Sequence, residues 1–124
     1  MTTQALAILY AALAALPAAM HIALAAGAPL GRFTVGGRFP GRLPPLWRGL
    51  ALVQAGLLAG MALVVLDRGG ALSSGLPAGL FWPVVGLTLL TFLANAASPS
   101  RPERRVWTPV TLGMVASALG TAFV

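Results

Sequence analysis

The sequence predicts an all-α, polytopic membrane protein of one domain, in which four transmembrane helices form two hairpins. The 124 residues are 58% hydrophobic and only 8% charged, with a mean hydropathy of +0.89. A soluble domain carries about a quarter charged residues. Four apolar runs are long enough to cross a bilayer core of about 30 Å. All eight basic residues are arginines, and they lie in the connections between these runs.

The first hairpin is predicted from spans at residues 4–27 and 47–66. The first span is rich in alanine and contains the single histidine, His21. The second span begins at Trp47, a residue type that is common at membrane interfaces. Small residues let two helix backbones approach closely. We therefore predict that helices pack against the glycine face of the second span, formed by Gly49, Gly56 and Gly60.

The second hairpin is predicted from spans at residues 78–97 and 106–124. Pro83 falls in the first turn of the third span, where proline is tolerated. Trp82 and Trp107 stand near the starts of the two runs, as interfacial anchors do. The fourth span carries a second set of small residues that we predict to be packing positions: Gly113, Ser117 and Gly120.

Arginine counts predict the orientation of the chain. The 28–46 connection with its flank holds four arginines and the 98–105 connection holds three, whereas the middle connection has only Arg68, offset by Asp67. By the positive-inside rule, connections 28–46 and 98–105 are cytoplasmic and both termini are periplasmic or exterior. The alanine- and arginine-rich, lysine-free composition is typical of a GC-rich bacterial genome, so we expect a bacterial inner membrane.

Three polar side chains inside the spans are candidate site residues: His21, Gln54 and Asn95. His21 and Gln54 lie at similar depths on either side of the first connection, so they could form a hydrogen-bonded structural clasp. A proton relay or a ligand site is the alternative. We predict no metal site and no cofactor, with a haem held by His21 pairs across a dimer as an alternative. For Glu103 we expect a salt bridge with a neighbouring arginine.

The connection at residues 28–46 combines repeated Gly-Arg pairs with prolines. Glycine backbones let N–H groups converge on an anion, and arginine offers paired donors to phosphate or carboxylate. We therefore predict an anion or lipid-headgroup site there, with a purely topogenic loop as the alternative. Its candidate residues are Arg32, Arg38, Arg42 and Arg48.

The stretch from His21 through GAPLGRFTVGGRFPGRLPP resembles that of small, uncharacterised bacterial four-span inner-membrane proteins. In those proteins, a histidine near the end of the first span precedes a GxPxG…GG…GxLP connection. The likeness covers the first hairpin, and the downstream SRPERRVW before the last span agrees with it. The resemblance implies four helices and an inner-membrane location, and it implies no activity.

No Walker sequence, nucleophile elbow or carboxylate pair is present, so we name no catalytic residue and predict a non-enzymatic protein. The leading hypothesis is a homo-oligomer or an accessory subunit of a larger membrane complex, whose arginine-rich connection contacts anionic headgroups or a partner. The first alternative is a small transporter or channel for an anionic or amphiphilic solute. A weaker alternative is a cofactor-binding or enzymatic protein centred on His21. Expected partners are membrane lipids and a protein complex, and no nucleic acid.

Overall fold

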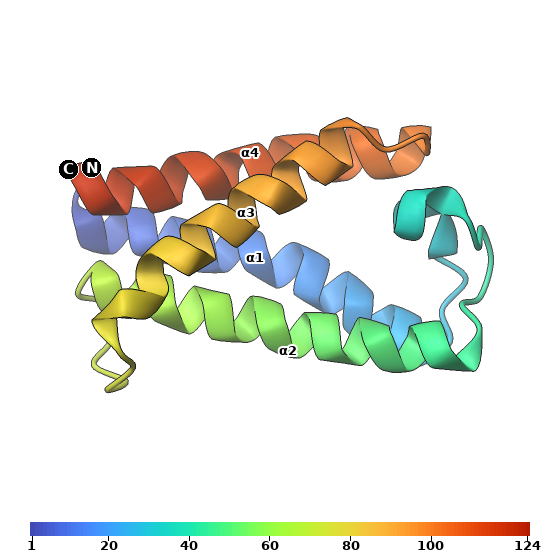
Figure 1. Cartoon of the computed structure of the whole chain (residues 1–124), viewed down its shortest axis with the longest axis horizontal. Coiled ribbons are helices and arrows are strands. Elements are labelled where there is room, and N and C mark those ends of the chain that lie inside the picture. Colours follow the sequence, from blue (N-terminus) through green and yellow to red (C-terminus); the bar gives the residue numbers. More distant parts are fainter.

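The computed structural model describes all 124 residues and is all-helical, which confirms the predicted fold class (Figure 1). Each long helix is long and apolar enough to cross a membrane. The third of these spans, Ala78–Ala96, consists of a short 3-10 turn followed directly by an α-helix. The four helices are α1 (Thr3–Ala25), α2 (Pro45–Arg68), α3 (Phe81–Ala96) and α4 (Arg101–Phe123), and the turns are η1 (Gly31–Phe33), η2 (Val35–Gly37) and η3 (Ala78–Leu80).

The helices are arranged as two hairpins that are joined through α1 and α4. Helix α1 packs closely on α2, α3 packs on α4, and α1 also packs along α4, whereas α2 and α3 meet much less. Both termini and the α2–α3 connection lie at one end of the bundle, called the terminal end below (Figure 1). The connections at 26–44 and 97–100 lie at the other, arginine-rich end.

Local capping explains where α1 and α4 begin. The Thr2 side chain accepts a hydrogen bond from Ala5 N–H at 3.0 Å, and the Ser100 hydroxyl accepts one from Glu103 N–H at 3.4 Å. Helix α4 therefore starts at Arg101, five residues before the predicted span at 106–124. Hydropathy defines only the apolar part of a helix, whereas the cap fixes its first residue.

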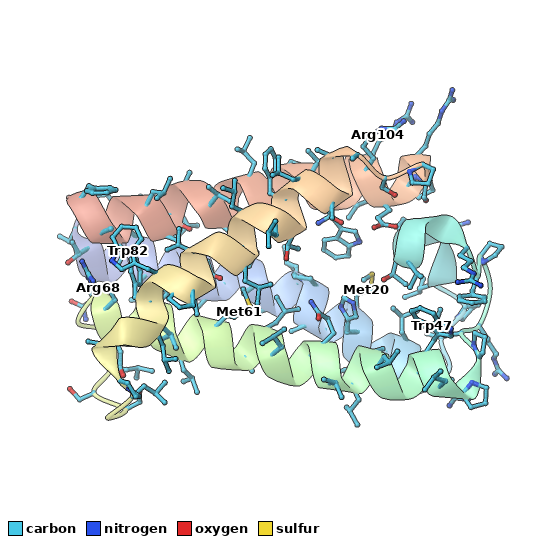
Figure 2. The ribbon with its side chains drawn as sticks, in the orientation of Figure 1. Met20, Trp47, Met61, Arg68, Trp82 and Arg104 are labelled. Atoms are coloured by element: carbon cyan, nitrogen blue, oxygen red, sulfur yellow. The ribbon has the colours of Figure 1, made fainter.

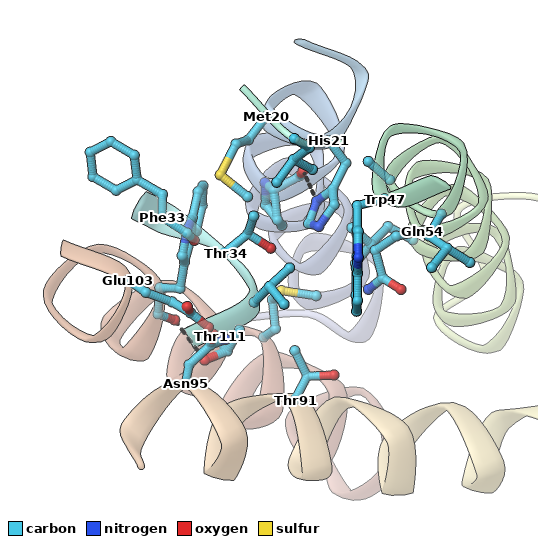
Figure 3. A pocket seen from close by; sticks show the side chains of 18 of the residues that line it. Met20, His21, Phe33, Thr34, Trp47, Gln54, Thr91, Asn95, Glu103 and Thr111 are labelled. Atoms are coloured by element: carbon cyan, nitrogen blue, oxygen red, sulfur yellow. Dashed lines mark hydrogen bonds between the residues drawn. The ribbon is translucent and has the colours of Figure 1, made fainter. Parts of the chain in front are cut away.

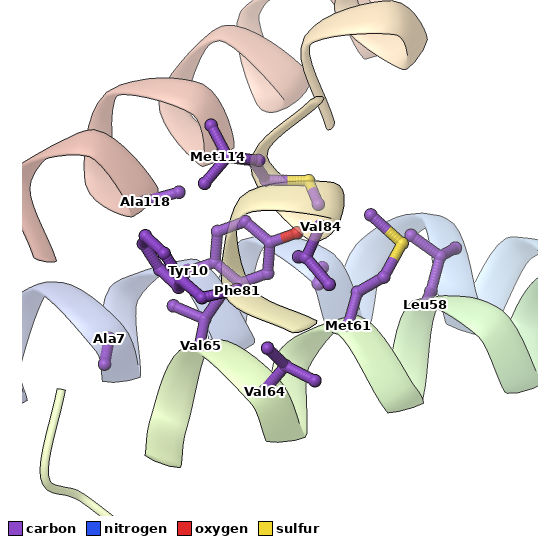
Figure 4. Close-up of a cluster of buried hydrophobic side chains, with 12 residues drawn as sticks. Ala7, Tyr10, Leu58, Met61, Val64, Val65, Phe81, Val84, Met114 and Ala118 are labelled. Carbon is purple, nitrogen blue, oxygen red and sulfur yellow. The ribbon is translucent and has the colours of Figure 1, made fainter. Parts of the chain in front are cut away.

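The main core fills the terminal end of the bundle (Figure 4). Tyr10 on α1 is fully buried there, and its hydroxyl lies 2.8 Å from Thr88 Oγ1 on α3. The Thr88 hydroxyl donates to the Val84 carbonyl at 2.7 Å, so Tyr10 is the donor to Thr88. This bond adds a polar link between α1 and α3 to the packing of Phe81 and Val65.

The two sets of predicted packing residues occupy different environments. A Cβ atom on Gly113 or Gly120 would lie 2.8 Å from a Leu13 or Leu6 side chain of α1, and Ser117 between them is buried. The α2 set does not pack within this chain. No atom lies within 4 Å of a Cβ built on any of its three glycines, because α1 and α3 contact other faces of α2. The packing predicted for Gly49, Gly56 and Gly60 is therefore not made within this chain, and packing against another helix stays a prediction.

We predict opposite effects of alanine substitution at Gly60, which lies within α2, and at Gly69, which follows the last residue of α2. A Cβ on Gly69 would overlap that of Ala7 and lie 2.8 Å from the Thr3 carbonyl oxygen. Gly69→Ala should therefore destabilise the protein by about 1–3 kcal/mol. Gly60→Ala, in open space, should be neutral or stabilise by up to about 1 kcal/mol through helix propensity. Thermal unfolding in detergent compares the two variants, and equal midpoints would contradict the packing described here.

Candidate functional site

A cavity of about 290 Å³ lies between the helices in the half of the bundle toward the arginine-rich end. All four long helices and the 26–44 connection contribute to its wall. Figure 3 shows His21, Trp47 and Gln54 on one side of it and Asn95, Glu103 and Thr111 on the other. All three intramembrane polar residues singled out in the sequence therefore line one cavity.

The connection at residues 26–44, called the lid below, is a folded cover over the cavity. Gly31 N–H donates to the Gly41 carbonyl at 2.9 Å and closes the lid into a loop, whose Leu43 is 4% exposed. Gly31 has no room for a side chain, because a Cβ would overlap the Phe39 carbonyl oxygen and lie 2.6 Å from that of Gly41. The glycine at this position is therefore a steric requirement of the closed loop.

Three hydrogen bonds fasten the lid to the start of α4. The Trp107 indole N–H donates to the Phe33 carbonyl at 2.9 Å, Gly36 N–H donates to Glu103 Oε2 at 2.8 Å, and the Ser100 hydroxyl donates to the Arg32 carbonyl. The chain reaches these positions through three consecutive residues with positive φ, namely Val35 (53°), Gly36 (63°) and Gly37 (75°). A β-branched residue at positive φ is strained and is held only where its surroundings fix it.

His21 does not form the predicted clasp with Gln54. Its Nδ1 lies 2.7 Å from the Pro17 carbonyl oxygen one turn earlier in α1, and this carbonyl can only accept. Nδ1 is therefore the donor, and in the neutral ring Nε2 is an acceptor without a partner in the chain. The nearby carbonyl outcompetes Gln54 because it is held on the same helix. Both side chains still face the cavity.

Three threonine hydroxyls in the cavity wall donate to their own helices. Thr111 donates to the Trp107 carbonyl at 2.6 Å, Thr91 to that of Leu87 at 2.9 Å, and Thr88 to that of Val84 at 2.7 Å. A hydroxyl has one proton, so these oxygens offer only lone pairs to anything else. Thr88 already accepts from Tyr10, which leaves Thr91 and Thr111 as acceptors in the wall.

Glu103 is buried in the cavity wall, and the expected salt bridge is absent. The residue is 9% exposed, and the only hydrogen bond to its carboxylate comes from Gly36 N–H. Arg104 donates instead to the Ser98 carbonyl at 2.7 Å, and no arginine lies within ion-pair distance. The Ser100-x-x-Glu103 pattern is a capping-box signal that places Glu103 in the first turn of α4. This local pattern is the signal in the sequence that could have identified Glu103 as more than a surface residue.

The candidate anion-binding arginines do not converge on one point. Arg32, Arg38 and Arg42 are exposed, and the guanidinium groups of the first two lie 4.9 and 5.2 Å from the centres of the phenylalanine rings that follow them. Arg48 is half-buried, and its Nε donates to the Ala25 carbonyl at 3.1 Å. None of the eight arginines lines the cavity.

The chemistry that the cavity wall offers is hydrogen bonding and charge. Of the histidine, cysteine, aspartate and glutamate side chains, only His21 and Glu103 line it, and the chain has no group of three or more such residues that could hold a metal ion. The part of the wall nearer the arginine-rich end, called the upper wall below, presents the Glu103 carboxylate, the His21 imidazole and the amides of Gln54 and Asn95. The deeper wall is apolar and includes Leu58, Met61 and Met114. This gradient suits an amphiphilic ligand.

No family model, curated protein or solved structure matches this chain. The resemblance of its first hairpin to small bacterial four-span proteins therefore stays a prediction. A function for the chain has to be argued from its own cavity and lid.

We predict that alanine at Gly31 opens the lid, whereas alanine at Gly41 leaves it closed. The first substitution forces a Cβ into the Phe39 carbonyl, and the second has nothing within 4 Å. Limited trypsin digestion reports the difference, because Arg32, Arg38 and Arg42 lie in the lid. Gly31→Ala should be cut there at least several-fold faster than the wild type, and Gly41→Ala at the wild-type rate. Identical cleavage of both variants would show that the lid is loose.

Proposed function

We propose that this protein binds a small amphiphilic molecule that enters the cavity sideways from the membrane, as a carrier or transporter would. The observation that supports the proposal is a cavity with a polar upper wall, built within four helices that are each apolar enough to cross a membrane. Polar side chains at that depth are costly and are typical of ligand or ion pathways. A structural hydrogen bond between them would have been the simpler explanation, and His21 and Gln54 do not make one.

The lateral opening follows from the arrangement of α2 and α3. The two helices diverge toward the arginine-rich end (Figure 1), and Leu50 in the cavity wall is 47% exposed on the outer surface. On the facing helix, Thr91 in the same wall is half-buried. Cavity residues of α2 extend from Trp47 to Met61, about 20 Å at 1.5 Å per residue. An opening along this length of an apolar helix faces lipid chains.

Filling the cavity should abolish binding, and a neighbouring position provides the control. Thr91→Phe places a ring in the cavity wall, whereas Leu90→Phe adds a similar ring on a side chain that is 64% exposed. In a Trp82→Phe background, fluorescence comes from Trp47 and Trp107, which both line the cavity. A brominated single-chain alcohol in phosphatidylcholine nanodiscs should quench wild type and Leu90→Phe alike and quench Thr91→Phe several-fold less. Equal quenching of all three proteins would refute the proposal.

We also propose the orientation in a bacterial inner membrane, with the arginine-rich end in the cytoplasm. Seven of the eight arginines belong to that end, and only Arg68 belongs to the terminal end (Figure 2). Trp47 and Trp82 mark the two ends as interfacial anchors would (Figure 2). Alkaline phosphatase fusions after Ser73 and at the C-terminus should be active, and a fusion after Arg42 should be inactive. Activity of the Arg42 fusion would reverse the orientation.

A second candidate function is a self-associating or accessory membrane subunit that contacts anionic headgroups. The supporting observations are the uncovered glycine face of α2 and the exposed arginines of the lid. Each basic residue near an anionic surface contributes about 1 kcal/mol. We rank this function second because lipid covers such a glycine face equally well. A monomeric mass in detergent and unchanged retention of anionic lipid after Arg32→Lys, Arg38→Lys and Arg42→Lys would exclude it.

A further inference from the structure

We propose that the ligand of this cavity is a protonated amine with an apolar chain, and that Glu103 is its counter-ion. This inference rests on the proposed function, since it names the chemical class that the same cavity takes. It differs from the anionic solute named in the first alternative of the sequence analysis, and it keeps the amphiphilic character of that alternative. Charge, hydrogen-bonding capacity and aromatic content of the wall each point to a cation.

The charge of the wall comes from Glu103 alone. The chain has only two acidic residues, and this one is 9% exposed, faces the cavity and lacks an ion-pair partner. Removing a carboxylate from water without a counter-charge is strongly unfavourable. One N–H from Gly36 offsets part of this cost, and Oε1 has no donor in the chain. A cationic ligand supplies the missing partner, and an anionic one adds repulsion.

The hydrogen-bonding groups of the wall are mostly acceptors. The Glu103 carboxylate and Nε2 of neutral His21 are acceptors. The hydroxyls of Thr91 and Thr111 already donate to carbonyls of their own helices, so they can only accept from a ligand. The Trp107 indole N–H already donates to the Phe33 carbonyl in the lid. The remaining free donors are the Trp47 indole, the Thr34 hydroxyl and the amides of Gln54 and Asn95, and the hydroxyl and the two amides accept as well. An ammonium group, which only donates, matches such a wall.

The aromatic content of the wall also favours a cation. Trp47, Trp107 and Phe33 line the cavity, and Trp107 follows Glu103 by four residues, about one turn of α4. Aromatic rings attract cations through their quadrupole, and tryptophan does so most strongly. The apolar chain of the ligand would extend toward Leu58, Met61 and Met114.

A displacement series tests the ligand class. The brominated alcohol is the reporter, and dodecylammonium, dodecanol and dodecyl sulfate compete for it in nanodiscs of zwitterionic phosphatidylcholine. The Thr91→Phe variant gives the background from partitioning into the bilayer. We expect dodecylammonium to displace the reporter at a concentration about tenfold lower than dodecanol, since a hydrogen bond to a charged group is typically worth about a factor of ten or more. Dodecyl sulfate should be the weakest competitor.

Variants of the two acidic residues then identify the counter-ion. Glu103→Gln keeps an oxygen that can accept from Gly36 N–H, so the lid should stay closed, and trypsin digestion verifies this. It should reduce the preference for dodecylammonium over dodecanol to less than twofold. Asp67→Asn removes the same charge outside the cavity and should leave the preference unchanged. Adding Asn95→Asp to Glu103→Gln returns a carboxylate to the cavity wall and should restore the preference.

The outcomes separate this inference from the proposed function. If no amphiphile binds above the Thr91→Phe background, the proposed function fails. If dodecanol or dodecyl sulfate binds as tightly as dodecylammonium, the cavity binds amphiphiles but the inference is wrong. An unchanged preference in Glu103→Gln, with the lid intact, would likewise overturn the role of Glu103.

Discussion

The hydrogen bond from Gly31 N–H to the Gly41 carbonyl is the constraint on which the cavity depends. It closes the lid, whose Phe33 carbonyl accepts from Trp107 and whose Gly36 N–H donates to Glu103. Peptide groups near lipid must find partners within the protein. The lid meets this requirement with loop closure and with donors and acceptors on α4. The same bonds orient Trp107 and Glu103 in the cavity wall.

The cavity exists because α3 is held at one end of the bundle and kept away from α2 at the other. Near the terminal end, Phe81 and the Tyr10–Thr88 bond join α3 to the main core. Near the arginine-rich end, a second cluster with Trp107, Leu43 and Met20 joins the lid to α1 and α4. Trp47 packs against this cluster from α2. The lid and its aromatic neighbours therefore join α1, α2 and α4 at this end, and this second cluster contains no residue of α3.

Hydropathy predicted the four spans because crossing a membrane is a property of each segment alone. The cavity could be predicted only in part, as a set of polar residues at similar depth. The role of Glu103 depends on Gly36, which is 67 residues away in sequence, and no local pattern contains such a contact. Glycine spacing was equally ambiguous. Gly113 and Gly56 each belong to a set of small residues on one face of a helix, but only Gly113 lies against a side chain of another helix, that of Leu13. The spacing shows which residues share a face, and it does not show what packs against that face.

At the arginine-rich end, the buried Glu103 carboxylate and three arginines lie within the same short stretch of chain, residues 101–105. An arginine within about 4 Å of Glu103 would neutralise it and fill the cavity, and Arg104 is the adjacent residue. The Arg104 guanidinium instead donates to the Ser98 carbonyl at 2.7 Å. Arginines are weakly hydrated cations that readily pair with carboxylates. Their absence from the wall leaves the one buried carboxylate without a counter-charge in the chain, which the proposed cationic ligand would supply.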